Sequence, residues 1–313
     1  TGGDFTNNIS GSGQVVKSDD DVLTLSGANS YSGGTLISDG TLVASNVDAL
    51  GSGDVTNNAT LEMNTGGDFI NNIGGTGRVE KSGDDTLTLS GSNTYTGGTL
   101  ISDGTLVASN VEALGTGDVT NNATLELNTG GTFDNAISGS GQVVKSGDDV
   151  LTLSGANSYS GGTLISDGTL VASNVEALGS GDVTDDATLE LNTGGTFDNA
   201  IGGSGNVVKS GADTLTLSGS NSYTGTTISG GTLVASNVEA LGTGDVTNNA
   251  TLELNTGGDF INNIGGTGRV EKSGDDTLTL SGSNSYTGGT TISGGTLVAT
   301  NVEALGSGDV TDD

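Results

Sequence analysis

The stretch from Asp84 to Gly98 reads DDTLTLSGSNTYTGG, and the stretch from Asp275 to Gly289 reads DDTLTLSGSNSYTGG. The two differ at one position, where Ser285 stands in place of Thr94. In both, hydroxyl and apolar side chains alternate before a corner of Gly, Ser and Asn, which is the pattern of a β-strand with one buried face that ends in a turn. The number of times this pattern recurs decides the fold class.

The pattern belongs to a repeat that occurs five times in the 313 residues. Each copy begins with Thr-Gly-Gly, then Asp or Thr, then Phe, and the copies start at Thr1, Thr65, Thr129, Thr193 and Thr256. The last of these intervals is one position shorter than the others, because one glycine is missing after Tyr223, which indicates a turn there. We therefore predict one continuous fragment of five near-identical repeats, with bounds 1–64, 65–128, 129–192, 193–255 and 256–313.

A shorter period lies inside each copy. The motif Thr-Leu-x-apolar-Ser/Asn begins at Thr86, Thr105 and Thr124, it recurs in the next copy from Val150, and fourteen such segments can be counted along the chain. Units of about 20 residues with short strands and Gly-rich corners are typical of a β-solenoid, in which each coil is one rung. The sequence predicts an all-β parallel solenoid with about three rungs in each copy of the repeat.

The alternation also predicts which side chains are enclosed. The expected core side chains of the second copy and the start of the third are Leu87, Leu89, Ile101, Leu106, Leu125, Leu127 and Phe133. Stacked rungs place like residues above one another, so Ser90, Ser109 and Asn128 are expected to form a polar ladder whose amides bond along the axis.

The composition excludes several classes of function. There is no His, Cys, Pro or Trp, and 38 acidic residues face seven basic ones, giving a net charge of −31. A basic face for nucleic acid or anionic lipid cannot be assembled from so few cations, and no run of about 18 apolar residues exists. Without His there is no imidazole base and no usual catalytic zinc site, and any paired-carboxylate site would recur in nearly every copy. We expect no enzyme and no direct membrane insertion of this segment.

Lysine fills a single position of the repeat. We expect a sparse ladder that compensates the surrounding acidic charge, formed by Lys17, Lys81, Lys145, Lys209 and Lys272. SGDDT and GSGDVTDDAT offer hard oxygen ligands near glycine turns, so calcium is open as a cofactor, but the calcium-binding nonapeptide and EF-hand spacings are absent and no cofactor is expected. A flat ice-binding array of Thr-x-Thr is a weaker alternative, because only one rung in three carries it.

The stretch SGSGQVVKSGDDVLTLSGANSYSGGTLISDGTL, residues 138–170, resembles the passenger-associated repeat of bacterial autotransporters, the AIDA-like adhesins of the type V secretion route. The resemblance lies in G-x-G-x-V-x-K-S-G, then L-T-L-S-G-x-N-x-Y-x-G-G-T, then I-S-x-G-T-L, and it recurs with small lapses in all five copies. It implies a right-handed parallel β-helix passenger, exported across the outer membrane of a Gram-negative cell and displayed on the surface.

The same resemblance implies adhesion or self-association. The expected partner is a host-cell surface or matrix glycoprotein, or another copy of the chain, bound through repeated lateral contacts such as the polar edge at residues 118–122. The alternative is a purely structural stalk that holds a distal functional domain away from the cell. Which of these roles applies, and whether the repeats are natural or a consensus design, stays open at the level of the sequence.

Overall fold

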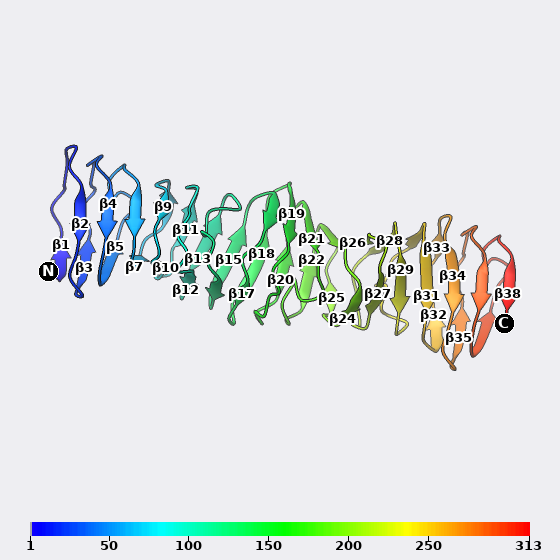
Figure 1. The fold of residues 1–313 in the computed structure, drawn as a ribbon. Helices are drawn as coiled ribbons and strands as arrows, with labels where there is room; N and C mark the ends of the chain where they lie inside the picture. Colours follow the sequence, from blue (N-terminus) through cyan, green and yellow to red (C-terminus); the bar gives the residue numbers. More distant parts are fainter. Residues whose placement is uncertain (1) are drawn as a thin grey trace. The chain divides into compact units, whose positions relative to one another are not determined.

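The computed structural model describes residues 2–313, and within that part of the chain every regular element is a short β-strand. The strands run from β1 to β38 and are joined by turns (Figure 1). The chain divides into two compact units, which are described separately. The first unit extends to Leu151 and includes Gly155–Gly162, and the second comprises Thr152–Ser154 and Thr163–Asp313. Strand β19 (Val150–Leu153) contributes residues to both.

The first unit is built from parallel sheets. Sheet 1A has the order β1 (Gly3–Phe5), β3 (Val22–Leu25), β5 (Thr41–Ala44), β7 (Thr60–Met63), β10 (Arg78–Lys81), β12 (Thr99–Ile101), β14 (Val119–Asn121) and β17 (Ile137–Ser138). Sheet 1B has the order β2 (Val15–Lys17), β4 (Thr35–Ile37), β6 (Val55–Asn57) and β9 (Ile73–Gly74). Sheet 1C has the order β8 (Gly67–Phe69), β11 (Thr86–Leu89), β13 (Thr105–Ala108), β15 (Thr124–Leu127) and β18 (Gln142–Lys145). Strand β16 (Gly131–Phe133) also belongs to this unit.

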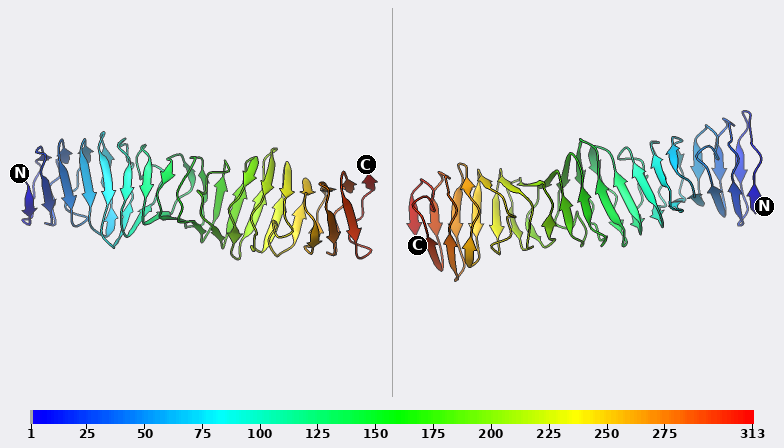
Figure 2. Two further views of the ribbon diagram at one scale, coloured as in Figure 1. Left: turned by 90° about the horizontal axis from the view of Figure 1, so that it is seen from below. Right: turned by 180° about the vertical axis from the view of Figure 1, so that it is seen from behind.

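The second unit repeats this plan (Figure 2). Sheet 2A has the order β20 (Thr163–Ile165), β22 (Val183–Asp185) and β25 (Ile201–Gly202). Sheet 2B has the order β21 (Thr169–Ala172), β23 (Thr188–Leu191), β26 (Asn206–Lys209), β28 (Gly225–Ile228), β30 (Val246–Asn248) and β33 (Ile264–Gly265). Sheet 2C has the order β24 (Gly195–Phe197), β27 (Thr214–Leu217), β29 (Thr232–Ala235), β31 (Thr251–Leu254), β34 (Arg269–Lys272), β36 (Thr290–Ile292) and β38 (Val310–Asp312). Sheet 2D has the order β32 (Gly258–Phe260), β35 (Thr277–Leu280) and β37 (Thr296–Ala299).

Each unit is a parallel β-solenoid, as the repeat predicts. Paired residues are 18 to 20 positions apart, from Leu61 opposite Val79 to Val79 opposite Thr99, so one turn of chain lies directly on the next. The two units together contain about 16 turns. Counting Thr-Leu motifs finds only fourteen, because strands such as β10, which reads RVEK, complete turns without that motif.

One copy of the repeat does not close a whole number of turns. From Gly67 the second copy lays down β8 to β15 and two segments without strand geometry, Asn93–Tyr95 and Glu112–Leu114. The first of these stacks on β9, since Thr94 N donates to Ile73 O at 2.8 Å. Ten segments are thus distributed over three faces. Because three does not divide ten, each copy ends one face further round than it began.

The second unit displays this shift directly. Strands β21, β29 and β37 all read TLVA, and they lie in the three different sheets 2B, 2C and 2D. The sequence spacing explains it. Thr251 at the start of β31 pairs with Arg269 at the start of β34, which is one turn further along in the same sheet. The next Thr-Leu motif begins only at Thr277 in β35, by which time the chain has passed one more corner and entered another sheet.

The interior of each unit is filled by stacked apolar rows. Leu87, Leu106, Leu125 and Val143 pair in register on successive turns of sheet 1C, and all four are fully buried. A parallel sheet needs cover on its inner face, and in a solenoid the other faces of the same coil supply it. Whether the five repeats form one continuous β-helix stays a prediction, since the structure defines the two units separately.

Candidate functional site

The side chains predicted to form the core point inward. Leu87, Leu89, Ile101, Leu106, Leu125 and Leu127 are fully buried, and Phe133 is 1% exposed. Outward positions alternate with them. In sheet 1C the outward row runs through Asp68, Thr88, Val107, Glu126 and Val144, which pair in register.

The five lysines lie at corners of the solenoid, and their side chains are buried. The Lys81 side chain is fully buried, and its Nζ donates to Ser82 O at 2.8 Å and Gly83 O at 2.5 Å. A third bond, at 3.4 Å, reaches Asp103 O on the next turn. Burial lowers the pKa of Lys81, and nearby carboxylates, Asp103 first among them, act in the opposite direction. The ammonium group therefore satisfies backbone carbonyls at a corner, which surface charge compensation would not require.

The predicted lysine ladder does not form. Lys17, Lys81 and Lys145 lie in sheets 1B, 1A and 1C respectively, and Lys209 and Lys272 lie in sheets 2B and 2C. The reason is the advance of one face per copy, which places the successive lysines of each unit in different sheets. The stem of each lysine instead packs in an apolar row, as Lys81 does between Met63 and Ile101.

The tyrosines are interior side chains with satisfied hydroxyl groups. Tyr95 is fully buried, and its hydroxyl shares a hydrogen bond of 2.6 Å with Thr99 Oγ1. Burial raises its pKa, and the Thr99 bond opposes this effect. The same 2.6 Å pair recurs between Tyr31 and Thr35. The tyrosine rings are therefore not available on the surface as a platform for sugars or bases, whereas the Phe5 side chain is 41% exposed.

Stacked glutamates explain where the two arginines occur. Glu62 and Glu80 face each other in register on sheet 1A, and like charges at such positions repel. Arg78 NH2 lies 2.9 Å from Glu80 Oε2, and Glu62 accepts a bond of 2.7 Å from Ser82 Oγ. Where the third copy has Val144 opposite a glutamate, it has no arginine.

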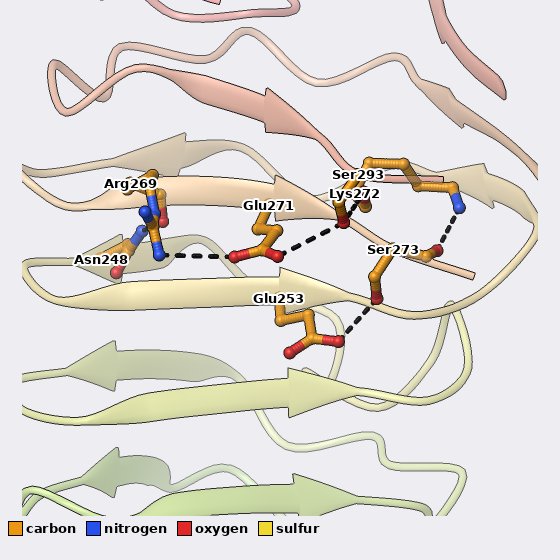
Figure 3. A network of polar contacts seen from close by, with 7 residues as sticks. All are labelled: Asn248, Glu253, Arg269, Glu271, Lys272, Ser273 and Ser293. Carbon is orange, nitrogen blue, oxygen red and sulfur yellow. Dashed lines mark hydrogen bonds and ion pairs between the residues drawn. The ribbon is translucent and has the colours of Figure 1, made fainter. Parts of the chain in front are cut away.

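Figure 3 shows the same arrangement in the second unit. Glu253 and Glu271 pair in register, and the Arg269 guanidinium lies 3.4 Å from Glu271. Glu253 accepts a bond of 2.6 Å from Ser273 Oγ, and Glu271 accepts one of 3.3 Å from Ser293 Oγ. Both glutamates are thus neutralised or bonded within the fold.

The predicted polar ladder stacks, but its bonds differ from the expectation. Residues 90, 109 and 128 follow strands that pair in register on successive turns. Ser109 Oγ donates to Leu89 O at 3.1 Å, so the bond runs from hydroxyl to backbone instead of from amide to amide. Amide bonds along the axis occur one residue further on, where Asn110 Nδ2 donates to Ser90 O at 3.0 Å.

Shallow hollows recur on the first unit. One of about 510 Å³ is lined by Val111, Glu112, Asp118 and Asp134 among others, and an equivalent of about 230 Å³ lies one copy earlier beside Val47 and Asp48. Neither is lined by an aromatic side chain. Among residues 2–313 no cluster of three or more His, Cys, Asp and Glu side chains could hold a metal ion, and that part of the chain has no helix long and apolar enough to cross a membrane.

One buried group was missed at the level of the sequence. Asp185 is fully buried, and its Oδ2 is the one buried side-chain polar atom without a hydrogen-bond partner in the part of the chain that the structure describes. The signal was present, because the first, second and fourth copies have Asn57, Asn121 and Asn248 at that position. Comparing the copies position by position would have found it.

These features define the class of protein: a three-faced β-solenoid whose structural corners and polar outer rows recur in every copy. The model of the passenger-associated-transport-repeat matches the chain once per copy, at residues 15–44, 79–108, 143–172, 207–235 and 270–299. The adhesin BmaC autotransporter of Brucella suis biovar 1 (strain 1330) is 31% identical over 371 aligned positions, which take in 97% of this chain and 10% of that protein. No solved structure matches the chain significantly.

The chain belongs to the autotransporter passengers that carry passenger-associated-transport repeats. It spans about a tenth of the length of the adhesin that it matches. Passengers of this family are exported and exposed at the outer surface of the cell, which is where this segment belongs.

Proposed function

We propose that this segment is an adhesive β-helical rod that makes repeated, weak lateral contacts and carries out no catalysis. Its partner is a host-cell surface or matrix glycoprotein, or a second copy of the chain. The similarity to a protein named as an adhesin supports the general role. No metal or other cofactor takes part, so removal of divalent cations should leave adhesion unchanged.

The observation that carries the proposal is the advance of one face per copy. Exposed polar side chains such as Thr120 and Asn122, with Thr247 and Asn249 as their equivalents, recur at fixed positions of the repeat. Within the second unit, equivalent strands of successive copies lie in different sheets, so their outward side chains lie on different faces of the solenoid. Weak binding sites on several faces allow one segment to contact several partner molecules at once, for example on a crowded surface. The combined contacts bind more strongly than any single one, by avidity.

A bead assay tests adhesion directly. Beads that display the full chain, attached through one end, are compared with beads that display a β-solenoid of equal length and charge but unrelated surface residues. Retention of matrix protein or clumping of the beads above the control supports the proposal. Equal behaviour of the two bead populations rejects it.

The second candidate is a structural stalk. It is supported by the similarity of the copies, since the buried lysine and the buried tyrosine recur in each one. Removing whole copies of the repeat from the parent protein separates the two functions. Graded loss of adhesion with each copy removed indicates lateral binding, whereas abrupt loss below one length indicates a stalk.

A further inference from the structure

A buried asparagine ties successive turns together in three of the copies. Asn57, Asn121 and Asn248 are fully buried. In each, Nδ2 donates to a backbone carbonyl on the next turn, at 2.9, 2.8 and 2.9 Å respectively. In each, Oδ1 accepts from the amide two positions later, at 3.2, 3.2 and 3.1 Å. One side chain thus satisfies a donor on its own turn and an acceptor on the next.

Asp185 occupies this position in the third copy and can make only half of the arrangement while ionised. Its Oδ1 accepts from Ala187 N at 3.2 Å, as in the other copies. Its Oδ2 takes the place of the asparagine NH₂ and has no partner. In the first, second and fourth copies the accepting carbonyl lies 21 positions further along the chain, so the equivalent carbonyl here is that of Asn206. An ionised carboxylate has no proton to donate to it. Burying an unpaired carboxylate oxygen is costly.

The surroundings supply no cation to compensate. Asp186, which follows Asp185, adds a second negative charge, and Tyr223 is the other ionisable group that acts on it electrostatically. Strands β20 and β25 bring Ile165 and Ile201 to β22.

The charged side chains of the next strands along the chain, β23 and β26, have other partners. Glu190 accepts from Ser210 Oγ at 2.5 Å. Lys209 donates to the carbonyls of Ser210 and Gly211. A Cβ added at Gly205 would lie 2.5 Å from Asp185 Cγ, so the backbone of the next turn packs closely against the carboxyl group.

We propose that Asp185 is a proton-binding site built into the third copy, in which the neutral carboxyl donates Oδ2–H to the carbonyl of Asn206. Protonation then completes the inter-turn bond that asparagine makes in the first, second and fourth copies. The turns around β22, β25 and β26 are held more firmly in mildly acidic solution than in neutral solution. The equivalent turns of the first, second and fourth copies, which have asparagine at this position, do not respond.

The direction of the pH effect follows from the geometry. Burial raises the pKa of Asp185 from 3.8 to about 6, while bonds from the backbone amides of Ala187 and Leu189 oppose the rise. The folded state therefore binds the proton more tightly than the unfolded state. Local stability is greatest below the unfolded pKa and is lost as pH rises from about 4 through about 6.

Amide hydrogen exchange on the full chain tests the proposal. After correction for the intrinsic exchange rate, protection around Asn206 should be about tenfold or more higher at about pH 5 than at about pH 7.5. The equivalent amides around Arg78 and Gln142 serve as internal references and should not change. Protection around Asn206 that is independent of pH overturns the proposal.

Two variants sharpen the test. Asp185→Asn should abolish the pH dependence and hold the region at its acidic level of protection, because asparagine already fits this position three times in the same chain. Asp186→Asn, a change at the adjacent side chain, should keep most of the pH dependence. If instead calcium raises protection at neutral pH in the unmodified chain and not in Asp185→Asn, the carboxylate is a metal ligand and the proton site is rejected.

Discussion

Individual polar side chains hold the corners of this solenoid. At the corners the chain passes from one face to the next, and some of its carbonyls do not pair with a neighbouring strand. A buried lysine or asparagine donates the missing hydrogen bond to such carbonyls. Lys145 illustrates the arrangement, since Nζ donates to Ser146 O at 2.7 Å and Gly147 O at 2.6 Å. These side chains replace bonds that water would otherwise make.

Replacing Lys81 with methionine should lower the stability of the first unit. Methionine keeps most of the apolar stem but leaves the carbonyls of Ser82 and Gly83 without a donor, which typically costs about 1 to 3 kcal/mol. Denaturant unfolding of Lys81→Met measures the change. Arg78→Met is the matched control, because Arg78 is about half exposed and its ion pair contributes little. Equal effects of the two substitutions would contradict a role for the buried lysine at the corner.

Replacing Asp185 with asparagine should stabilise the chain at neutral pH and have little effect in acid. The raised pKa of Asp185, about 6, means that at pH 7.5 the folded state carries a buried charge that the variant lacks. The expected gain is on the order of 1 to 2 kcal/mol after allowance for screening by water. Thermal unfolding at the two pH values measures it. A gain that is the same at both would show that the effect is not electrostatic.

The number of residues between strands has more influence on how the strands stack than the sequence of any one strand. The missing glycine after Tyr223 is absorbed locally: β28 begins at Gly225, and Asn206 pairs with Gly225 at an offset of 19 where Val79 pairs with Thr99 at an offset of 20. The missing glycine instead lengthens a side-chain hydrogen bond. The Tyr223 hydroxyl lies 3.1 Å from Thr226 Oγ1, compared with 2.6 Å for the equivalent pair in other copies.

Deleting one turn should be tolerated far better than deleting part of one. Residues 105–123 make up one full turn, because they are as many residues as separate the paired Leu106 and Leu125. Their removal therefore leaves every later strand on its original face. Removal of residues 111–123 takes out two segments and shifts each later strand by one face. Circular dichroism and thermal unfolding should show a native-like solenoid for the first variant and loss of cooperative unfolding for the second. Comparable behaviour of the two would refute the three-face assignment.

The chain as a whole combines a repetitive surface with a strong negative charge. At a net charge of −31, two molecules of the chain repel each other at long range, whereas a basic partner is attracted. Salt weakens both effects, because the screening length falls to about 8 Å at physiological ionic strength. The two kinds of partner can therefore be told apart without knowing either one.

Clumping of beads that carry the chain should increase with the concentration of sodium chloride if the partner is a second molecule of the chain. Retention of a basic matrix protein should decrease over the same range of salt. Light scattering and bound protein are measured on the same beads, with an uncharged bead coating as the control. Adhesion that does not vary with salt would indicate that neither charge repulsion nor charge attraction governs the contact.

The strand pattern, the inward side chains such as Leu87 and Leu106, and the parallel solenoid could all be predicted from the amino-acid sequence. Strict alternation of apolar and polar side chains, together with the short period inside each copy, leaves few other ways to bury the leucines. The tertiary structure alone decided how one copy of the repeat maps onto three faces, and hence that Lys17, Lys81 and Lys145 do not stack. The spacing of motifs in the sequence gives only the distance along the chain. The face on which a strand lies depends on the number of corners that precede it. Short segments without a strand pattern also occupy a face, so they add corners that the sequence does not reveal.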